Sequence, residues 1–179
     1  MPTTTLETIW TRPALMIFSE TEPVAVNINA GQWDIGSAGS NFLYLTDDNR
    51  SELQIGLERI ETKKRMINGR MRAYHVADKR NFNVSWQDLP SLNSVISERA
   101  QGGSSTGWAS CQEMLTWYKD HTGSFYLTLV YDTPSAPAGA PLKYSLEYFN
   151  VFFDDFNYVI KKRGNQTDLW DISMSLVEV

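Results

Sequence analysis

A hairpin built around an Asn-Gly pair is the feature that most constrains how this chain can fold. Apolar and polar residues alternate over 53–57, and Asn68-Gly69 follows further along the chain. Such alternation is typical of a β-strand with one covered face. Asn-Gly is the pair preferred in two-residue type I′ turns, because both turn residues must adopt positive φ. Apolar residues resume after the turn, so we predict a long β-hairpin over residues 52–77.

Further strands are predicted wherever short apolar runs or alternation recur. They fall at 24–28, 42–45, 82–86, 125–131, 144–153, 156–160 and 170–176. The segment 125–131 is apolar on both faces, which indicates a central strand. The last segment places Trp170, Ile172, Met174 and Leu176 on one face of an amphipathic strand.

A single helix is expected in the second half of the chain. Thr106 can cap it, and its apolar face is expected to contain Trp108, Cys111, Leu115 and Tyr118. His121-Thr122-Gly123 is expected to end it. One helix among many strands predicts a mainly β fold, namely an antiparallel β-barrel or sandwich with one flanking α-helix and a long protruding hairpin.

The 179 residues are expected to form one domain. We predict an N-terminal arm over residues 1–25 and a single β domain over 26–179. The chain has no apolar run long enough to span a bilayer and no secretory signal pattern, so no membrane partner is predicted. Its single cysteine, Cys111, excludes an internal disulfide framework and is expected to be a buried thiol.

No residue pattern indicates catalysis, a cofactor or a metal site. His75 and His121 are too few for a His-rich centre, and we expect both to be structural. The side chains of Asp154 and Asp155 point to opposite faces if they lie on a strand, so they cannot form a carboxylate pair by themselves. Phosphate-binding loops and hydrolase or metalloprotease motifs are absent from the sequence. We therefore predict that the protein is not an enzyme, although carboxylates brought together from distant segments would leave a hydrolase open.

Positive charge gathers at the predicted hairpin tip, although the whole chain has a formal net charge of −5. We predict a contact between subunits there, made by Lys63, Lys64, Arg65, Asn68, Gly69, Arg70 and Arg72. A basic hairpin facing an acidic copy of the same chain is electrostatically complementary. Head-to-tail contacts of this kind produce rings or stacks. A solvated hairpin tip and a nucleic-acid contact are the alternatives, and the acidic balance disfavours the second.

Aromatic residues cluster near the predicted strand 144–153. Tyr144, Tyr148, Phe149, Phe152, Phe153 and Phe156 are either core and interface residues or a platform for a sugar ring. A carbohydrate-binding β-sandwich is therefore an alternative function.

The layout resembles the tail-tube family of tailed bacteriophages. The resemblance rests on four segments: Met66–Arg70 at the hairpin, Tyr74–Pro90, Gly102–Lys119, and Lys161–Val179. Members of this family have a β-barrel or sandwich, one flanking helix and a long hairpin loop that reaches the next ring.

The resemblance implies a virion structural protein, made in the bacterial host cytoplasm and located in the phage tail. It implies hexameric rings that stack around a lumen, contact other tail proteins, and conduct DNA without binding it specifically. The predicted arm and the Pro-rich segment 132–142 leave open a distal-tail, baseplate or tube-initiator ring instead.

Overall fold

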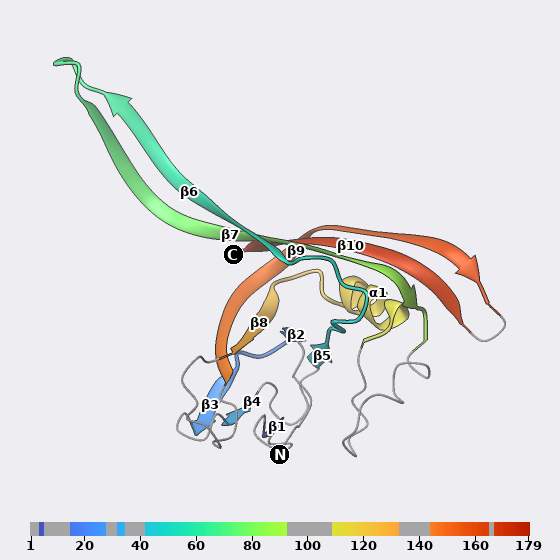
Figure 1. Cartoon of the computed structure of the whole chain (residues 1–179). Helices are drawn as coiled ribbons and strands as arrows, with labels where there is room; N and C mark the ends of the chain where they lie inside the picture. The colour runs from blue at the N-terminus through green and yellow to red at the C-terminus, as the bar shows by residue number, and fades with distance from the viewer. Residues whose placement is uncertain are drawn as a thin grey trace.

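An open antiparallel sheet of seven strands organises the computed structural model, which describes residues 4–5, 15–27, 32–34, 42–92, 109–132, 144–164 and 167–179 (Figure 1). From one edge to the other the strands are β5 (Phe42–Tyr44), β2 (Met16–Ser19), β8 (Phe125–Asp132), β9 (Tyr144–Arg163), β10 (Asp168–Glu178), β7 (Met71–Pro90) and β6 (Gln54–Arg65). The fold is therefore mainly β, as predicted. The predicted barrel is not closed, because β5 and β6 lie at opposite edges of the sheet.

A second, smaller sheet contains β1 (Thr4–Thr5), β4 (Gln32–Asp34) and β3 (Val24–Asn27), in that order. The strand predicted at 24–28 thus exists, but it belongs to this separate sheet. Of the loop predicted at 132–142, Asp132 is the last residue of β8 (Phe125–Asp132), and residues 133–142 lie outside the described residues.

Two strands are longer than the sequence indicated. β7 and β9 each contain 20 residues, so the hairpin strand and the strand predicted at 82–86 are one element, as are those predicted at 144–153 and 156–160. The pairing of β9 with β10 shifts register at Asp154, between the pairs Ser175–Asp155 and Leu176–Phe153. Such a bulge interrupts the alternation without ending the strand, which explains why pattern reading divided β9.

The core lies between the inner face of the sheet and one helix. Trp170, Ile172, Met174 and Leu176 of β10 are all buried, which confirms the predicted amphipathic strand. β8 is an inner strand, paired with β2 and β9, as its two apolar faces predicted.

β2 corrects the predicted N-terminal arm. Met16, Ile17 and Phe18 are completely buried, and β2 hydrogen-bonds with β5 on one side and β8 on the other. The expectation that residues 1–25 lie outside the core is therefore wrong for this strand. A strand covered on both faces reads as a short apolar run without alternation, and four residues are too few to reveal it.

The helix α1 (Cys111–Asp120) packs beneath the sheet (Figure 1). Ser110, not Thr106, is its N-cap. The Ser110 Oγ accepts the Glu113 N–H, and the Glu113 carboxylate accepts the Ser110 N–H at 2.7 Å, which completes a capping box. Thr106 and Trp108 lie outside the described residues.

The apolar face of α1 is confirmed at Cys111, which is buried together with Met114 and Trp117. Leu115 is only partly buried and Tyr118 is 39% exposed. The buried residues from Cys111 to Trp117 follow at intervals of three, which is less than the 3.6 residues of a helical turn. The buried face therefore shifts around the helix, and Tyr118 lies at its edge. No helix among the described residues is long and apolar enough to span a membrane.

Candidate assembly interface

A two-stranded ribbon projects from the sheet. The pairing of β10 with β7 ends at Val177 and Asn81, whereas β6 and β7 stay paired from Gln54 and Asn83 out to Arg65 and Met71. Residues 57–80 therefore form a ribbon with no third strand among those the structure describes, and Figure 1 shows it extending away from the body. At a rise of roughly 3.3 Å per residue the ribbon is about 30 Å long.

The turn at the tip differs from the predicted type I′ turn. Gly69 has φ +76°, but Asn68 is not among the residues with positive φ. The Gly69 N–H donates to the Met66 carbonyl at 2.9 Å, and the Met66 N–H donates to the Arg70 carbonyl at 2.8 Å. These bonds define a three-residue loop, a type I turn followed by a left-handed glycine. The Asn68 Oδ1 accepts the Arg70 N–H at 3.1 Å, which stabilises this alternative.

The predicted contact residues all lie at this tip and are exposed. They are Lys63, Lys64, Arg65, Asn68, Gly69, Arg70 and Arg72. The pairing places Lys64 directly opposite Arg72, and like charges opposite each other destabilise a strand pair. Within the described part of the chain, Lys64, Arg65, Arg70 and Arg72 make no ion pair. The tip therefore concentrates positive charge that the described residues leave uncompensated.

Acidic side chains on the ribbon are engaged nearer its root. Asp78 Oδ1 lies 3.1 Å from Arg59 Nε and 3.0 Å from His75 Nε2. Both bonds lower the pKa of Asp78, and the bond from His75 has the larger effect. Glu61 accepts a bond from Lys63, and this bond lowers the pKa of Glu61. His75 and Arg59 thus share the Asp78 carboxylate.

The ribbon also exposes large apolar side chains, whereas the alternation over 53–57 predicted a strand with one covered face. They are Leu57, Ile60, Met66, Ile67, Met71, Tyr74 and Val76. Leu57 is 76% exposed and Ile67 is fully exposed. The sequence contains these apolar residues, but it does not show that no neighbouring strand covers them.

The ribbon's direction is held at its root. The Arg80 N–H donates to the Glu178 carboxylate at 2.9 Å, and the Arg80 guanidinium lies 4.4 Å from the centre of the Phe149 ring. Phe149 packs in turn on the buried Phe82. The root is thus tied to β9 and β10, which limits the directions in which the tip can point.

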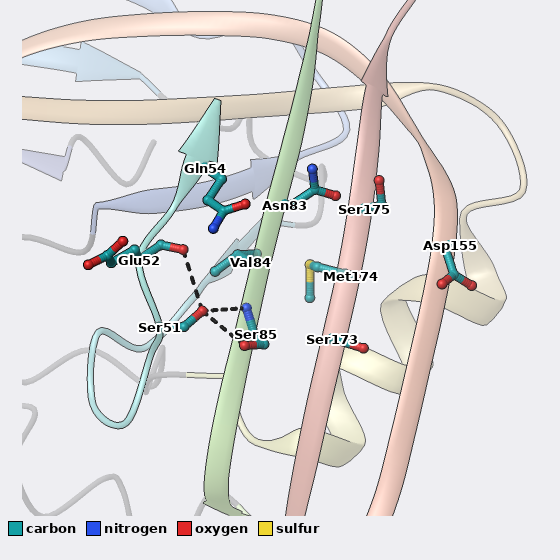
Figure 2. A pocket seen from close by; sticks show the side chains of 10 residues that line it. All are labelled: Ser51, Glu52, Gln54, Asn83, Val84, Ser85, Asp155, Ser173, Met174 and Ser175. Atoms are coloured by element: carbon teal, nitrogen blue, oxygen red, sulfur yellow. Dashed lines mark hydrogen bonds between the residues drawn. The ribbon is translucent and has the colours of Figure 1, made fainter. Parts of the chain in front are cut away.

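The outer face of the sheet next to the root is polar and shallowly hollowed. Figure 2 shows Asn83 and Ser85 from β7 beside Ser173 and Ser175 from β10 and Asp155 from β9. Ser51 Oγ accepts the Ser85 N–H at 2.9 Å. The hollow has a volume of about 320 Å³, and its lining residues include two carboxylates, Glu52 and Asp155, and no lysine or arginine.

Lys161, further along β9, is neutralised by acids. Its Nζ lies 3.0 Å from Asp171 Oδ2 and 3.5 Å from Asp88 Oδ1. The bond to Asp171 is the main cause that raises the pKa of Lys161. The pKa of Asp171 is lowered mainly by the hydrogen bond from the Asp88 N–H, and to a smaller extent by Lys161. The cation is therefore held by the protein instead of being offered to a ligand.

The cysteine, the second histidine and the adjacent aspartates considered in the sequence analysis lie in the following environments. Cys111 is buried and its thiol donates to the Leu89 carbonyl at 3.2 Å, as expected for a core thiol. His121 caps α1, and its Nδ1 and Nε2 contact the Trp117 carbonyl and Glu20. Asp154 and Asp155 are exposed, and Asp155 accepts a bond from Asn157 at 2.6 Å.

The aromatic cluster is divided between core and surface. Phe149 is buried, and Phe153 and Phe156 pack against the core. Tyr148 and Phe152 are exposed, and the side chain of Tyr144 lies outside the described residues. The Tyr148 hydroxyl donates to Glu22 at 2.7 Å. These aromatics therefore do not form a single flat platform.

Comparison of this chain with protein-family models, curated proteins and solved structures finds no significant match.

Proposed function

We propose that this chain is a virion structural protein of a tailed bacteriophage, whose copies form hexameric rings that stack into a tail tube and conduct DNA. The observation on which this proposal rests is the projecting ribbon of residues 57–80, with its exposed apolar side chains and with four tip cations that make no ion pair among the described residues. An isolated two-stranded hairpin is marginally stable in water, so this ribbon requires a partner surface. Contiguous exposed apolar groups likewise mark interaction sites.

A second copy of the chain is the partner that its charge favours. The net charge of the chain is −5 although the tip is basic. An acidic body and a basic projection attract each other head to tail. Such a contact uses different surfaces on the two copies, and repeats of it close into rings or continue as stacks.

The polar outer face suits a conduit for DNA. Phosphate groups bind to lysine and arginine through counterion release. The hollow of Figure 2 has carboxylates, serines and asparagine and no basic side chain, and Lys161 is paired with Asp171 and Asp88. A wall of this composition lets a polyanion pass without holding it.

The related alternative is a distal-tail, baseplate or tube-initiator ring, which shares the ring but not the long stack. The carbohydrate-binding alternative has less support, because Phe149, Phe153 and Phe156 pack in or against the core.

The proposal is tested by measuring the mass and shape of the purified protein. We expect light scattering after size-exclusion chromatography to give a multiple of the 20.4 kDa chain mass, and negative-stain electron microscopy to show rings or tubes with a central hole. A single ring that never stacks would favour the tube-initiator alternative. A monomer at every concentration tested would refute the ring proposal.

The tip's role in stacking is tested by replacing Lys63, Lys64, Arg65, Arg70 and Arg72 with alanine. We expect the tubes to be lost while the circular dichroism spectrum stays unchanged. Lys162→Ala with Arg163→Ala is the matched control, since these exposed cations lie at the other end of the sheet, and it should assemble normally. Normal tubes from the five-site variant would exclude the basic tip from the contact.

A further inference from the structure

An aromatic groove lies on the body at the rim of α1. Its walls are formed by the helix end 118–119, the loop 121–124, and Phe152 and Phe153 of β9. Its volume is about 470 Å³, which is within the range of clefts that receive a ligand or an inserted side chain.

The groove exists because β9 extends beyond the end of its neighbouring strand β8. β8 pairs with β9 only as far as the pair Phe125–Val151, so on that side the next residues of β9 have none of the described strands beside them. Helix α1 fills the space only in part. Tyr118 stacks on Phe156, with ring centres 4.7 Å apart, and meets Phe153 edge-on at 5.1 Å. Phe152 stays 41% exposed.

We infer that this aromatic groove is the receptor for the hairpin tip of a neighbouring copy. The inference rests on the proposed function, in which copies stack, and it adds the surface on which the tip docks. The apolar part of the tip consists of Met66, Ile67 and Met71, all exposed. Methionine sulfur packs favourably against aromatic rings. Met66 and Met71 of the tip can make this contact with the aromatic walls of the groove.

The charges beside the two surfaces are complementary. Asp120 and Asp154 are exposed and each adjoins a residue lining the groove. Lys119 is the single lysine or arginine among the described lining residues. The tip brings Lys64, Arg65, Arg70 and Arg72, which make no ion pair within the described part of the chain. Acidic partners would relieve the repulsion between Lys64 and Arg72, which face each other across the strands.

The arrangement of the fold makes the contact intermolecular. Figure 1 shows the tip of β6 and β7 far from α1, at the opposite side of the body. A chain therefore cannot insert its tip into its own groove, but it can insert it into that of the next copy. A contact between two different surfaces propagates instead of closing on a pair.

A pair of introduced cysteines tests the docking directly. Ile67→Cys with Thr122→Cys places one thiol at the tip and one in the groove. Under mild oxidation we expect a ladder of covalent oligomers, because a disulfide forms only when the two Cα atoms come within about 7 Å. Ile67→Cys with Ser173→Cys, which moves the second thiol to the polar hollow of Figure 2, is the control and should give no ladder. Native Cys111 is buried and does not compete.

The outcomes separate the two proposals. Rings or tubes without a ladder from the Ile67 and Thr122 pair would overturn the groove as receptor and leave the proposed function standing. A ladder from the Ser173 pair would place the tip on the polar hollow instead. Failure of the unmodified protein to assemble at all would overturn both proposals.

A mixing experiment checks the same contact without a crosslink. Ile67→Asp disables every tip and Phe152→Ser weakens every groove, so neither variant alone should stack beyond single rings. Mixed together, the intact tips of the second variant can enter the intact grooves of the first. We expect stacks of two rings and no longer ones. Long tubes from either variant alone would contradict the docking.

Discussion

At the scale of the residue, two buried tryptophans differ in whether their indole N–H makes a hydrogen bond. Trp86 and Trp170 are both buried, and both face the core. The Trp86 Nε1–H donates to the Thr46 carbonyl at 2.7 Å, whereas the Trp170 Nε1 has no hydrogen-bond partner within the described structure. The first indole ties the segment after β5 to β7, on the opposite side of the sheet, and the second contributes only its packing.

Trp86→Phe should therefore cost more stability than Trp170→Phe. Both changes reduce packing volume, but only the first leaves a buried carbonyl unsatisfied, which costs about 1–3 kcal/mol. We expect the free energy of unfolding in urea to fall by about that much more for Trp86→Phe. Equal losses for the two variants would show that the hydrogen bond contributes nothing net.

Cys111 should be inert in the folded protein. Burial raises the pKa of the Cys111 thiol to about 12, so at pH 8 only about one molecule in ten thousand has a thiolate. We expect no reaction with a disulfide reagent at pH 8 until urea unfolds the chain. Rapid modification of the native protein would refute the buried position of this thiol.

The same shift makes a prediction for alkaline pH. The folded pKa lies above the ordinary value of 9.0, so the unfolded chain loses this proton first as pH rises. The free energy of unfolding should be insensitive to Cys111 below about pH 8 and should fall as pH rises from about 9 towards 12. Cys111→Ala should flatten the slope in that window, and an unchanged slope would assign it to other groups.

At the scale of the element, a bulge shapes the ribbon. The pairing of β6 with β7 passes from Ile60–Ala77 to Glu61–His75, so Val76 is an extra residue in β7. A bulge bends its strand and increases the local twist, and the ribbon is visibly curved in Figure 1. The bulge therefore helps to determine where the tip lies relative to a neighbouring copy.

Deleting Val76 should impair assembly without unfolding the body. The ribbon contributes no residue between 57 and 80 to the buried core, so the free energy of unfolding should change by less than about 0.5 kcal/mol. The straightened ribbon should misplace the tip, and light scattering should show shorter stacks. The matched control, Val76→Ile, keeps both the bulge and the apolar surface and should assemble normally. Full-length tubes from the deletion variant would show that curvature is irrelevant.

At the scale of the whole molecule, the uneven distribution of charge makes assembly dependent on salt. A basic tip on an acidic chain attracts its neighbour over a distance set by screening, which is about 10 Å at 0.1 M salt and about 3 Å at 1 M. We expect tube formation to slow as salt rises, as followed by light scattering. The five-site alanine variant should show a weaker dependence on salt. Assembly that accelerates with salt would indicate that apolar contacts dominate instead.

The sequence by itself determined the local features of this protein. The buried face of β10, the approximate position of α1 and the basic hairpin tip followed from side-chain periodicity and from the Asn-Gly pair, because the direction of a side chain depends on its own backbone. The burial of alternate residues from Trp170 to Leu176 is an example. The same reasoning failed at short buried β2 and at the bulges of β7 and β9, where that periodicity is absent or interrupted.

Only the tertiary structure decided which surfaces stay uncovered. The ribbon projects because β10 ends its pairing with β7 at Val177 and Asn81, residues far apart in the chain. The aromatic groove opens because β8 stops beside Val151 while β9 continues. The end of a strand's pairing is a property of two distant segments at once, and the pattern of either segment alone does not contain it.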